Sequence, residues 1–486
     1  MLEKLAKQTA IYGISTIIGK MMSYLLTPFY TRIFTEGKYG IITDAYALIP
    51  FALVLLSLGM ESGYFRFAAK AEAEGGDVNK AKQKLFSSTW AITALAAITF
   101  FVVILFFQNQ VAALMGEVYI EHPAYVITIA AIILFDVISA VPFARLREEG
   151  RAGTFVLLRL LNIMMQVAFA FIFWGCGLMD GEYGVQWAFI ANLLASAITA
   201  VILVIICRTI PKISWSIIAA VAIYSMPLLI SGIAGTAGEL LDRQLIKYLL
   251  PVNSMSELGL YGAITKLAVV MTLFTQMYRL AAEPFFLSNF SKDNFIESAA
   301  EAMKYFILAS IIIFLGIVLY SDLFALIIGH EFRKGMHILP IVLLGNVLSG
   351  VWLNLSFWYK REEKTKYALY ITLIGVGCSL LFGYLFIPRL GYTGAAYSRL
   401  MAEISMVIVS LTLTKIYYPT PYEWKKILKY VLVGALIYIL SFSYANLNII
   451  FRYAISTTLM LAFLFYVARA EKIDTKGLVK SILHRR

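Results

Sequence analysis

The chain contains about fourteen apolar stretches that are each long enough to cross a membrane as a helix. The hydrocarbon core of a bilayer is about 30 Å thick, and a helix needs roughly 20 mainly apolar residues to span it. Hydrophobic residues make up 60% of the chain and charged residues only 14%, which excludes an ordinary soluble domain. The sequence therefore predicts an all-α, polytopic membrane protein.

The predicted spans follow from where each apolar stretch begins and ends. Their approximate bounds are 8–33, 40–65, 85–107, 123–144, 153–175, 185–207, 215–241, 260–287, 303–320, 336–358, 367–387, 392–415, 427–445 and 449–468. Lys4 and Lys7 precede the first stretch and no cleavage pattern follows, so we expect an uncleaved first helix.

The distribution of basic residues over the loops predicts the orientation, because Lys and Arg gather on the cytoplasmic side. Alternate loops are rich in them, for example Arg66, Lys70, Lys80, Lys82 and Lys84, then Arg145, Arg147 and Arg151, then Lys360, Arg361, Lys364 and Lys366. The loops around residues 117–122 and 180–182 contain neither Lys nor Arg. We expect both termini in the cytoplasm and a place in the inner (cytoplasmic) membrane. The net charge of +12 then faces anionic lipid headgroups, so membrane lipids and not nucleic acid are the expected partners.

Three short segments recur in the same order along the chain, which indicates an internal repeat. Residues 36–40 match 257–262, residues 147–149 match 361–363, and residues 181–184 match 391–394. Because matched segments lie on the same predicted side, the repeating unit has an even number of spans, and the two halves are parallel. We expect six-span halves at 1–212 and 213–418 around a central cavity, with two further spans and a basic tail at 419–486.

Several diffuse motifs carry a family resemblance over the whole chain. They are Thr-Ala-Ile-Tyr-Gly at 9–13, Pro-Phe-Tyr-Thr-Arg-Ile at 28–33, Leu-Asp-Arg at 241–243, Gly-Leu-Tyr-Gly at 259–262 and the turn at 391–396. The sequence resembles the polysaccharide transport family of the multidrug, oligosaccharidyl-lipid and polysaccharide exporter superfamily, which includes O-antigen and repeat-unit flippases. The resemblance implies a carrier that moves polyprenyl-pyrophosphate-linked oligosaccharides to the outer leaflet for cell-surface polysaccharide biosynthesis. Whether it hands its load to a polymerase or a glycosyltransferase stays open.

Charged residues recur inside the apolar spans, where each costs about 2.5 to 3.5 kcal/mol, so we expect them to face a watery cavity. The cations predicted to bind the anionic oligosaccharide-lipid through its diphosphate are Lys20, Arg32, Arg159, Arg243, Lys266 and Arg279. The alternatives are snorkelling to the interface and neutralisation by ion pairs. Helical i,i+4 spacing relates three pairs: Arg279 with Glu283, Arg399 with Glu403, and Glu239 with Arg243.

Acidic residues also lie within the spans, and a carboxylate there can carry a proton or a sodium ion that resets a carrier. The acidic set is Asp44, Glu61, Asp136, Glu239, Asp242, Glu283 and Glu403. We predict ion coupling through Asp44, Glu61 and Asp242. An inside-negative potential would itself favour export of an anionic headgroup.

A flexible segment is predicted in the seventh span, where Pro227 precedes Gly232, Gly235 and Gly238. Proline removes a helix hydrogen bond, and glycines at this spacing leave a thin face. Together with Pro28 in the first span they are predicted hinges for alternating access. Static close packing of the glycine face is the alternative.

Other functions lack their signatures. No G-x-x-x-x-G-K-[ST] loop is present, so direct ATP drive is not expected. The His and Cys residues show no metal-ligand spacing, and we expect a carrier rather than an enzyme, with no metal or cofactor. Two exporters of the same superfamily stay as alternatives: an ion-coupled multidrug exporter, against which the basic residues argue, and a lipid II-type peptidoglycan-precursor flippase. A membrane-embedded polymerase or glycosyltransferase would need a large loop or domain with clustered carboxylates.

Overall fold

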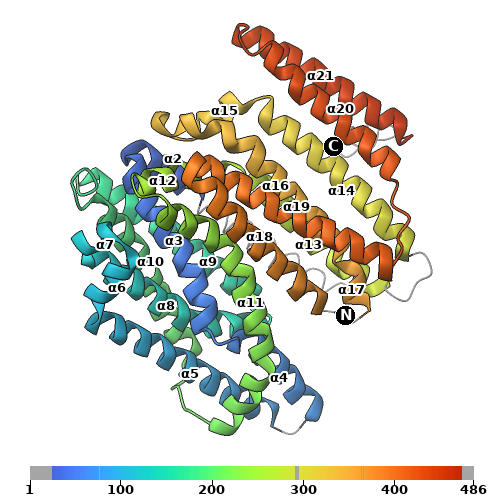
Figure 1. Ribbon diagram of the computed structural model, residues 1–486. Helices are drawn as coiled ribbons and strands as arrows, with labels where there is room; N and C mark the ends of the chain where they lie inside the picture. Colours follow the sequence, from blue (N-terminus) through green and yellow to red (C-terminus); the bar gives the residue numbers. More distant parts are fainter. Residues whose placement is uncertain (1–23, 76, 290–294, 363, 365, 473–486) are drawn as a thin grey trace, which may run out of the picture. The chain divides into compact units, whose positions relative to one another are not determined.

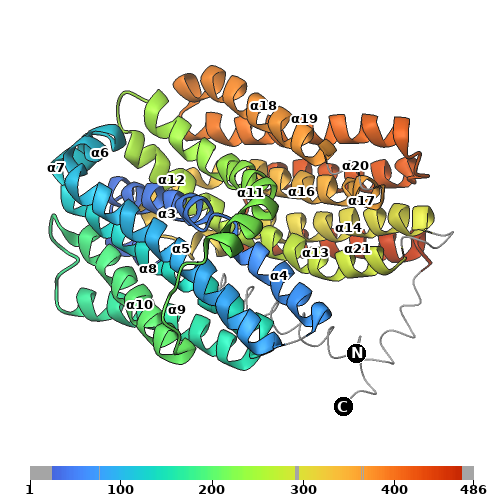
Figure 2. The same ribbon diagram turned by 90° about the horizontal axis from the view of Figure 1, so that it is seen from below.

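The computed structural model describes residues 24–75, 77–289, 295–362, 364 and 366–472. Throughout these residues the regular secondary structure is helical (Figures 1 and 2). The helices are α2 Leu26–Ile33, α3 Glu36–Leu56, α4 Met60–Glu74, α5 Val78–Phe106, α6 Gln108–Met115, α7 Glu117–Glu121, α8 Pro123–Glu148, α9 Ala152–Gly175, α10 Gly184–Cys207, α11 Trp215–Leu249, α12 Ser254–Leu267, α13 Val269–Asn289, α14 Phe295–Val318, α15 Ser321–Ala325, η1 His330–Ile338, α16 Leu339–Leu355, α17 Phe357–Arg361, α18 Lys366–Leu390, α19 Tyr392–Tyr417, α20 Trp424–Ser443 and α21 Ile449–Ala470.

The predicted spans correspond to these helices. Within the described residues, 12 helices are long and apolar enough to cross a membrane, and the pair α12 and α13, bent by 48°, makes up to 13. Together they cover each span predicted between residues 40 and 468. Of the predicted span 8–33, only the end that forms α2 belongs to the described residues. The prediction of an all-α, multi-pass membrane protein is confirmed.

The chain forms two compact units. Unit 1 comprises residues 1–263 and 379–398, and unit 2 comprises residues 264–378 and 399–486. Helices α12, α18 and α19 therefore contribute residues to both units. The repeat boundaries at 212 and 418 stay a prediction.

Helix α8 lies at the centre of unit 1. It packs between α5 and α10 and also contacts α3, α4 and α9 (Figure 1). Of its most apolar window, 72% is buried, a larger share than in any other candidate span among the described residues. Residues such as Val137, Val141 and Ala144 are fully buried on it. A polar side chain on α8 is therefore costly unless it meets polar partners or a water-filled space.

Two glycines of the repeated motif bring α3 and α12 into close contact within unit 1. A Cβ atom on Gly40 would lie 1.8 Å from the carbonyl oxygen of Met255. A Cβ atom on Gly262 would lie 2.4 Å from Oγ1 of Thr43. Small residues allow helix backbones in membranes to approach in this way. The recurrence of Tyr-Gly at 39–40 and 261–262 therefore has a packing reason, since each glycine meets the helix that carries the other.

We expect Gly40→Ala to destabilise the protein by about 1 to 3 kcal/mol or more, because the obstructing atom is backbone and cannot move aside. Gly377→Ala is the matched control, since no described atom lies within 4 Å of its Cβ position on α18. The control should be neutral or stabilising by about 0.5 to 1 kcal/mol. Thermal unfolding of the purified protein in detergent measures both changes. Equal stability of the two variants would contradict the tight α3–α12 contact.

In unit 2, ion pairs hold the α20–α21 hairpin to α14 at one end and to α15 at the other. Nζ of the buried Lys304 on α14 lies 2.8 Å from Oε1 of Glu423 and 2.9 Å from Oε2 of Glu471. The Tyr430 hydroxyl donates to Glu471 at 2.5 Å. We call Lys304, Glu423, Glu471 and Tyr430 the ionic clasp. At the other end of the hairpin, Arg452 pairs with Asp322, and the apolar side chains between the two ends form a common core.

Candidate functional site

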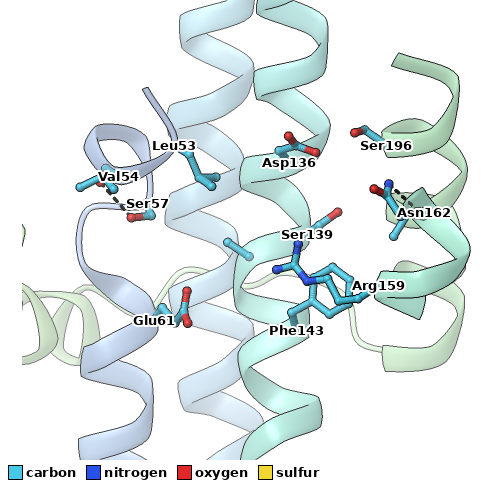
Figure 3. A pocket seen from close by; sticks show the side chains of 12 residues that line it. Leu53, Val54, Ser57, Glu61, Asp136, Ser139, Phe143, Arg159, Asn162 and Ser196 are labelled. Atoms are coloured by element: carbon cyan, nitrogen blue, oxygen red, sulfur yellow. Dashed lines mark hydrogen bonds between the residues drawn. The ribbon is translucent and has the colours of Figure 1, made fainter. Parts of the chain in front are cut away.

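Unit 1 contains a polar cavity of about 190 Å³ (Figure 3). Side chains from α3, α4, α8, α9 and α10 line it, together with Ser57 between α3 and α4. Its polar and charged lining residues are Ser57, Glu61, Asp136, Ser139, Arg159, Asn162, Ser196 and Thr199. Two of the predicted site residues, Glu61 and Arg159, thus share one cavity. Such a concentration of polar groups inside an apolar helix bundle is costly and marks a candidate functional site.

Arg159 is the cation of this cavity. Its guanidinium lies over the ring of Phe143, with Cζ 4.0 Å from the ring centroid, and points into the cavity (Figure 3). Asp136 and Glu61 are the two carboxylates whose charges attract it. Among the described residues, no carboxylate oxygen lies within the 4.0 Å of an ion pair with Arg159. The guanidinium is therefore attracted by two carboxylates without being fixed to either.

Glu61 connects the cavity to the end of α8. Its carboxylate forms an ion pair with Arg147 in the last turn of that helix. The Arg147 guanidinium also lies over the rings of Phe65 and Phe155, at 5.0 and 5.6 Å from their centroids. Positive and negative charges therefore alternate from the end of α8 into the interior of unit 1, in the order Arg147, Glu61, Arg159 and Asp136.

The remaining cavity wall offers hydroxyl and amide groups. The Ser196 hydroxyl faces Asp136 (Figure 3), and Asn162 donates from Nδ2 to Oγ1 of Thr199 at 3.0 Å. One turn further along α9, Gln166 donates to the hydroxyl of Tyr46 at 3.2 Å. These groups can solvate a proton, water molecules or a small ion near the carboxylates.

Asp44 forms a second buried charged cluster in unit 1. It is fully buried and accepts hydrogen bonds from Tyr119 at 2.8 Å, from Gln244 at 2.7 Å and from Lys247 at 2.5 Å. The Lys247 side chain is itself 4% exposed. We call these four residues the Asp44 cluster. It joins α3, α7 and α11, and its single negative charge is matched by one positive charge.

Asp242, the third carboxylate predicted for ion coupling, lies on α11 with 4% of its surface exposed. It accepts a hydrogen bond from the Tyr261 hydroxyl at 3.3 Å and one from the Ser379 hydroxyl at 3.1 Å. Of the three predicted carboxylates, Glu61 is the one that lines the described cavity.

The other predicted headgroup-binding cations lie on separate helices. Arg32 is exposed on α2 and donates to the carbonyl oxygen of Pro28 at 2.8 Å. Arg243 and Lys266 are half-buried on α11 and α12, and Arg279 is exposed on α13. Lys20 lies outside the described residues. The role of this set stays a prediction.

Ion pairing at helical spacing is confirmed for Arg399, whose Nη2 lies 3.0 Å from Oε1 of Glu403. The side chain of Glu283, the predicted partner of Arg279, lies outside the described part of the chain.

The predicted hinge residues lie in helices. Pro28 belongs to α2, and Pro227 stands inside the uninterrupted α11. A Cβ atom on Gly232 would lie 3.2 Å from Cγ1 of Val54, so this glycine packs closely. For Gly235 and Gly238, no described atom comes within 4 Å of the Cβ position. Hinge motion at these positions stays a prediction.

Sequence reasoning did not predict what three charged residues contact. Lys247 and Lys304 have acidic partners far away in the chain, and no local pattern reveals such pairs. Asp136 stood among the acidic residues of the spans, but its position on the most buried helix was not apparent. The described residues contain no group of three or more His, Cys, Asp or Glu side chains that could hold a metal ion.

The helical fold and the charged cavity together describe a multi-pass membrane protein with a polar site inside its helix bundle. Residues 5–290 match the family described as Polysaccharide biosynthesis protein, and the chain belongs to this family. This finding confirms the family resemblance drawn from the sequence motifs. The comparison with curated protein sequences gives no match.

Solved structures share the fold. The lipid II flippase MurJ in an inward closed conformation superposes with a TM-score of 0.74 at 16% identity, over 95% of this chain and 99% of that one. An inward-facing MATE-family multidrug resistance transporter of the MOP superfamily gives 0.66 at 12% identity, over 82% and 94% of the two chains. An outward-facing MATE-family transporter gives 0.57 at 16% identity, over 85% and 95%. The chain therefore has the fold of MOP-superfamily transporters.

Proposed function

We propose that this protein is a flippase that moves polyprenyl-diphosphate-linked oligosaccharide repeat units across the cytoplasmic membrane by alternating access, with both termini in the cytoplasm. The observation that carries the proposal is the match to a polysaccharide biosynthesis family in a chain that has a transporter fold over nearly its whole length. A lipid-linked oligosaccharide is made where sugar nucleotides are, inside the cell, and its charged headgroup cannot cross hydrocarbon unaided. Polysaccharide polymerases or glycosyltransferases are the partners that would supply or use such a substrate.

The basic residues within the spans support an anionic headgroup as substrate. Arg and Lys form charge-assisted hydrogen bonds to phosphate oxygens, which are stronger than neutral hydrogen bonds. Lys20, Arg32, Arg159, Arg243, Lys266 and Arg279 are the proposed headgroup-binding residues. An exporter of cationic drugs would need acidic residues in their place.

Ion coupling is part of the proposal. Asp44, Glu61 and Asp242 are the proposed coupling carboxylates, and the structure favours Glu61 among them because it faces the polar cavity. Asp44 and Asp242 are both deeply buried and hydrogen-bonded. If ions drive flipping through such carboxylates, collapse of the membrane potential and of both the proton and sodium gradients should slow it. An unchanged rate would remove coupling from the proposal.

A second candidate substrate is a lipid II-type peptidoglycan precursor, which the fold likeness to MurJ favours. Both substrates carry a polyprenyl diphosphate, so the basic residues do not discriminate between them. Flipping of one labelled substrate in the presence of an excess of the other would distinguish the two, because only the accepted substrate competes.

We expect Lys266→Ala to lower the flipping rate of a fluorescent polyprenyl-diphosphate oligosaccharide in proteoliposomes by about 10- to 100-fold. The reason is that a hydrogen bond to a charged group contributes about 1.5 to 3 kcal/mol. Lys429→Ala, which removes an exposed lysine from α20, is the matched control and should flip at the native rate. Native flipping by a folded Lys266→Ala variant would remove Lys266 from the headgroup site.

A further inference from the structure

We propose that an aromatic platform at the junction of α17, α18 and α19 binds a pyranose ring of the transported oligosaccharide. The platform consists of Trp358, Tyr367, Tyr370 and Tyr417, and all four residues belong to unit 2. The inference rests on the proposed function and deepens it, because it assigns a separate part of the protein to the sugar portion of the substrate. Sugar and diphosphate are then recognised by different side chains.

The four rings of the platform contact one another across three helices. Trp358 on α17 stacks on Tyr417 at the end of α19, with ring centroids 6.0 Å apart and an angle of 18° between the planes. The centroid of Tyr367 on α18 lies 5.6 Å from that of Trp358 and 5.4 Å from that of Tyr417. Tyr370 extends the group along α18, 6.5 Å from Tyr367. Segments that are distant in the chain thus form one continuous aromatic surface.

The burial of these rings differs from that of simple interfacial anchors. Tyr and Trp that anchor a protein in a membrane interface lie at the level of the lipid headgroups. Trp358 is 4% exposed, whereas Tyr417 and Tyr370 are 48% and 55% exposed. The buried indole therefore supports tyrosine rings that are still accessible. Aromatic rings fixed in this way offer a large contact area at a low cost in conformational entropy.

The first half of the predicted repeat has no ring at the corresponding positions. The Arg-Glu-Glu segments of the two halves begin at residues 147 and 361, a shift of 214 residues. With this shift, Ala144 and Gly153 correspond to Trp358 and Tyr367. Both halves cross the same membrane, so interfacial anchoring alone gives no reason for the difference. A site that binds one sugar chain in each molecule needs the rings in one half only.

A pyranose ring has the chemistry that this surface can bind. One face of the sugar carries C–H groups that pack on aromatic rings, and its hydroxyls form hydrogen bonds at the edges of such rings. The indole N–H of Trp358 is buried and has no hydrogen-bond acceptor among the described residues. An unpaired buried donor is costly. A sugar hydroxyl that reaches it when the Tyr417 ring turns aside can supply the missing acceptor.

Positive charge beside the platform complements the diphosphate to which the first sugar is joined. Nζ of the exposed Lys364 lies 5.6 Å from the centroid of the Tyr417 ring. Residues 360–366 contain four basic and two acidic residues, a net charge of +2. Lys residues bind phosphate oxygens by charge-assisted hydrogen bonds. The segment also lies on the predicted cytoplasmic side, where the lipid-linked oligosaccharide is made, so the platform is placed to receive the sugar before it crosses.

Calorimetric titration of the purified full-length protein in detergent tests the inference without any transport. The three probes are farnesyl diphosphates whose second phosphate is joined to N-acetylglucosamine, to galactose or to a methyl group, so all carry the same charge. Because stacking uses the C–H face of the sugar, both sugar probes should bind about 3- to 10-fold more tightly than the methyl probe. Equal affinity of the native protein for all three probes would overturn the inference.

Variants of the exposed rings separate sugar binding from diphosphate binding. Tyr417→Ala should abolish the preference for sugar probes and leave the affinity for the methyl probe unchanged, whereas Tyr417→Phe keeps the ring and should keep the preference. Lys364→Gln should weaken all three probes by a similar factor. Tyr384→Ala is the matched control, because it removes an exposed tyrosine about 21 Å along α18 from Tyr370. This control should show the native preference.

Tyr370→Ala is a second variant at an exposed ring, and it should reduce the preference for sugar probes. If both Tyr417→Ala and Tyr370→Ala keep the native preference, the rings serve only as interfacial anchors and the inference is overturned. Failure of the flippase proposal would show as absent flipping in vesicles. The ratio of probe affinities is measured on the protein alone, so the two failures are distinguishable.

Discussion

Asp44→Asn is expected to destabilise the protein by about 3 to 5 kcal/mol, because it leaves the ammonium of Lys247 buried without a counter-charge. The carboxylate accepts three hydrogen bonds in the native protein, and both partners of the ion pair are almost completely buried. Asparagine keeps the shape of the side chain and one acceptor oxygen, so the loss reports on charge more than on packing. Unfolding of the purified protein in detergent gives the difference.

An exposed ion pair is the matched control for Asp44. Lys70 and Glu74 form an i,i+4 pair at 3.5 Å, with 61% and 65% of their side chains exposed. Glu74→Gln should change the free energy of unfolding by no more than about 1 kcal/mol, because water solvates and screens such a pair. The double variant Asp44→Asn with Lys247→Met should recover part of the loss. A cost of under 1 kcal/mol for Asp44→Asn would show that the Asp44 cluster does not hold α11 to α3.

The second large effect is expected from Lys304→Met in unit 2. The native Lys304 is 5% exposed and bridges Glu423 and Glu471, so the substitution leaves the buried Glu471 carboxylate without its ion-pair partner. Removal of one partner of such a pair costs about 3 to 5 kcal/mol. The α20–α21 hairpin should separate from α14 first, which limited proteolysis of the purified protein would detect as cleavage near residue 420. Lys429→Met, an exposed position of α20, is the control, and equal resistance of both variants would contradict the ionic clasp.

The clasp also predicts a pH dependence with a definite sign. Hydrogen bonds from Lys304 and Lys426 lower the pKa of the Glu423 carboxyl. Burial acts to raise the pKa of the Glu471 carboxyl, but hydrogen bonds from Tyr430 and Lys304 outweigh it, so this pKa is also lowered. A carboxyl with a lowered folded-state pKa contributes stability above its ordinary pKa of 4.5, and this contribution is lost as the pH falls through the folded-state value. The native hairpin should therefore loosen on acidification below about pH 4.5. In Lys304→Met the sign is reversed: protonation of Glu471 removes a buried charge, so acid should stabilise the hairpin.

The sequence was sufficient for the span pattern, because hydrocarbon thickness imposes a minimum length on each apolar stretch. The helix Pro123–Glu148 and the stretch predicted at 123–144 differ by four residues at one end only. The predicted span 260–287 instead consists of two helices with a 48° bend between Leu267 and Val269. Hydropathy measures how apolar a segment is, so it cannot show that the helix axis changes direction within the segment.

Charged contacts between residues close together in the chain could be predicted from the sequence, and contacts between distant residues could not. Arg399 and Glu403 are four residues apart on one helix, so the periodicity of the helix predicts their pairing. Asp44 and Lys247 are separated by 203 residues, and their pairing depends on how α3 packs on α11. Arg159 and Asp136 face one cavity only because α8 and α9 pack with α4 and α10 around it. Composition and spacing can mark these residues as costly in a membrane, but only the packing shows what each of them faces.

The central claim is that the protein moves a lipid-linked anionic oligosaccharide across a bilayer. The most direct test reconstitutes the native protein in vesicles that contain a fluorescent polyprenyl-diphosphate oligosaccharide and follows how fast an external, impermeant quencher reaches the label. The account predicts that label from the inner leaflet becomes accessible in vesicles with protein and stays protected in vesicles without it. Equal protection in both, with protein that is folded and inserted, would contradict the account.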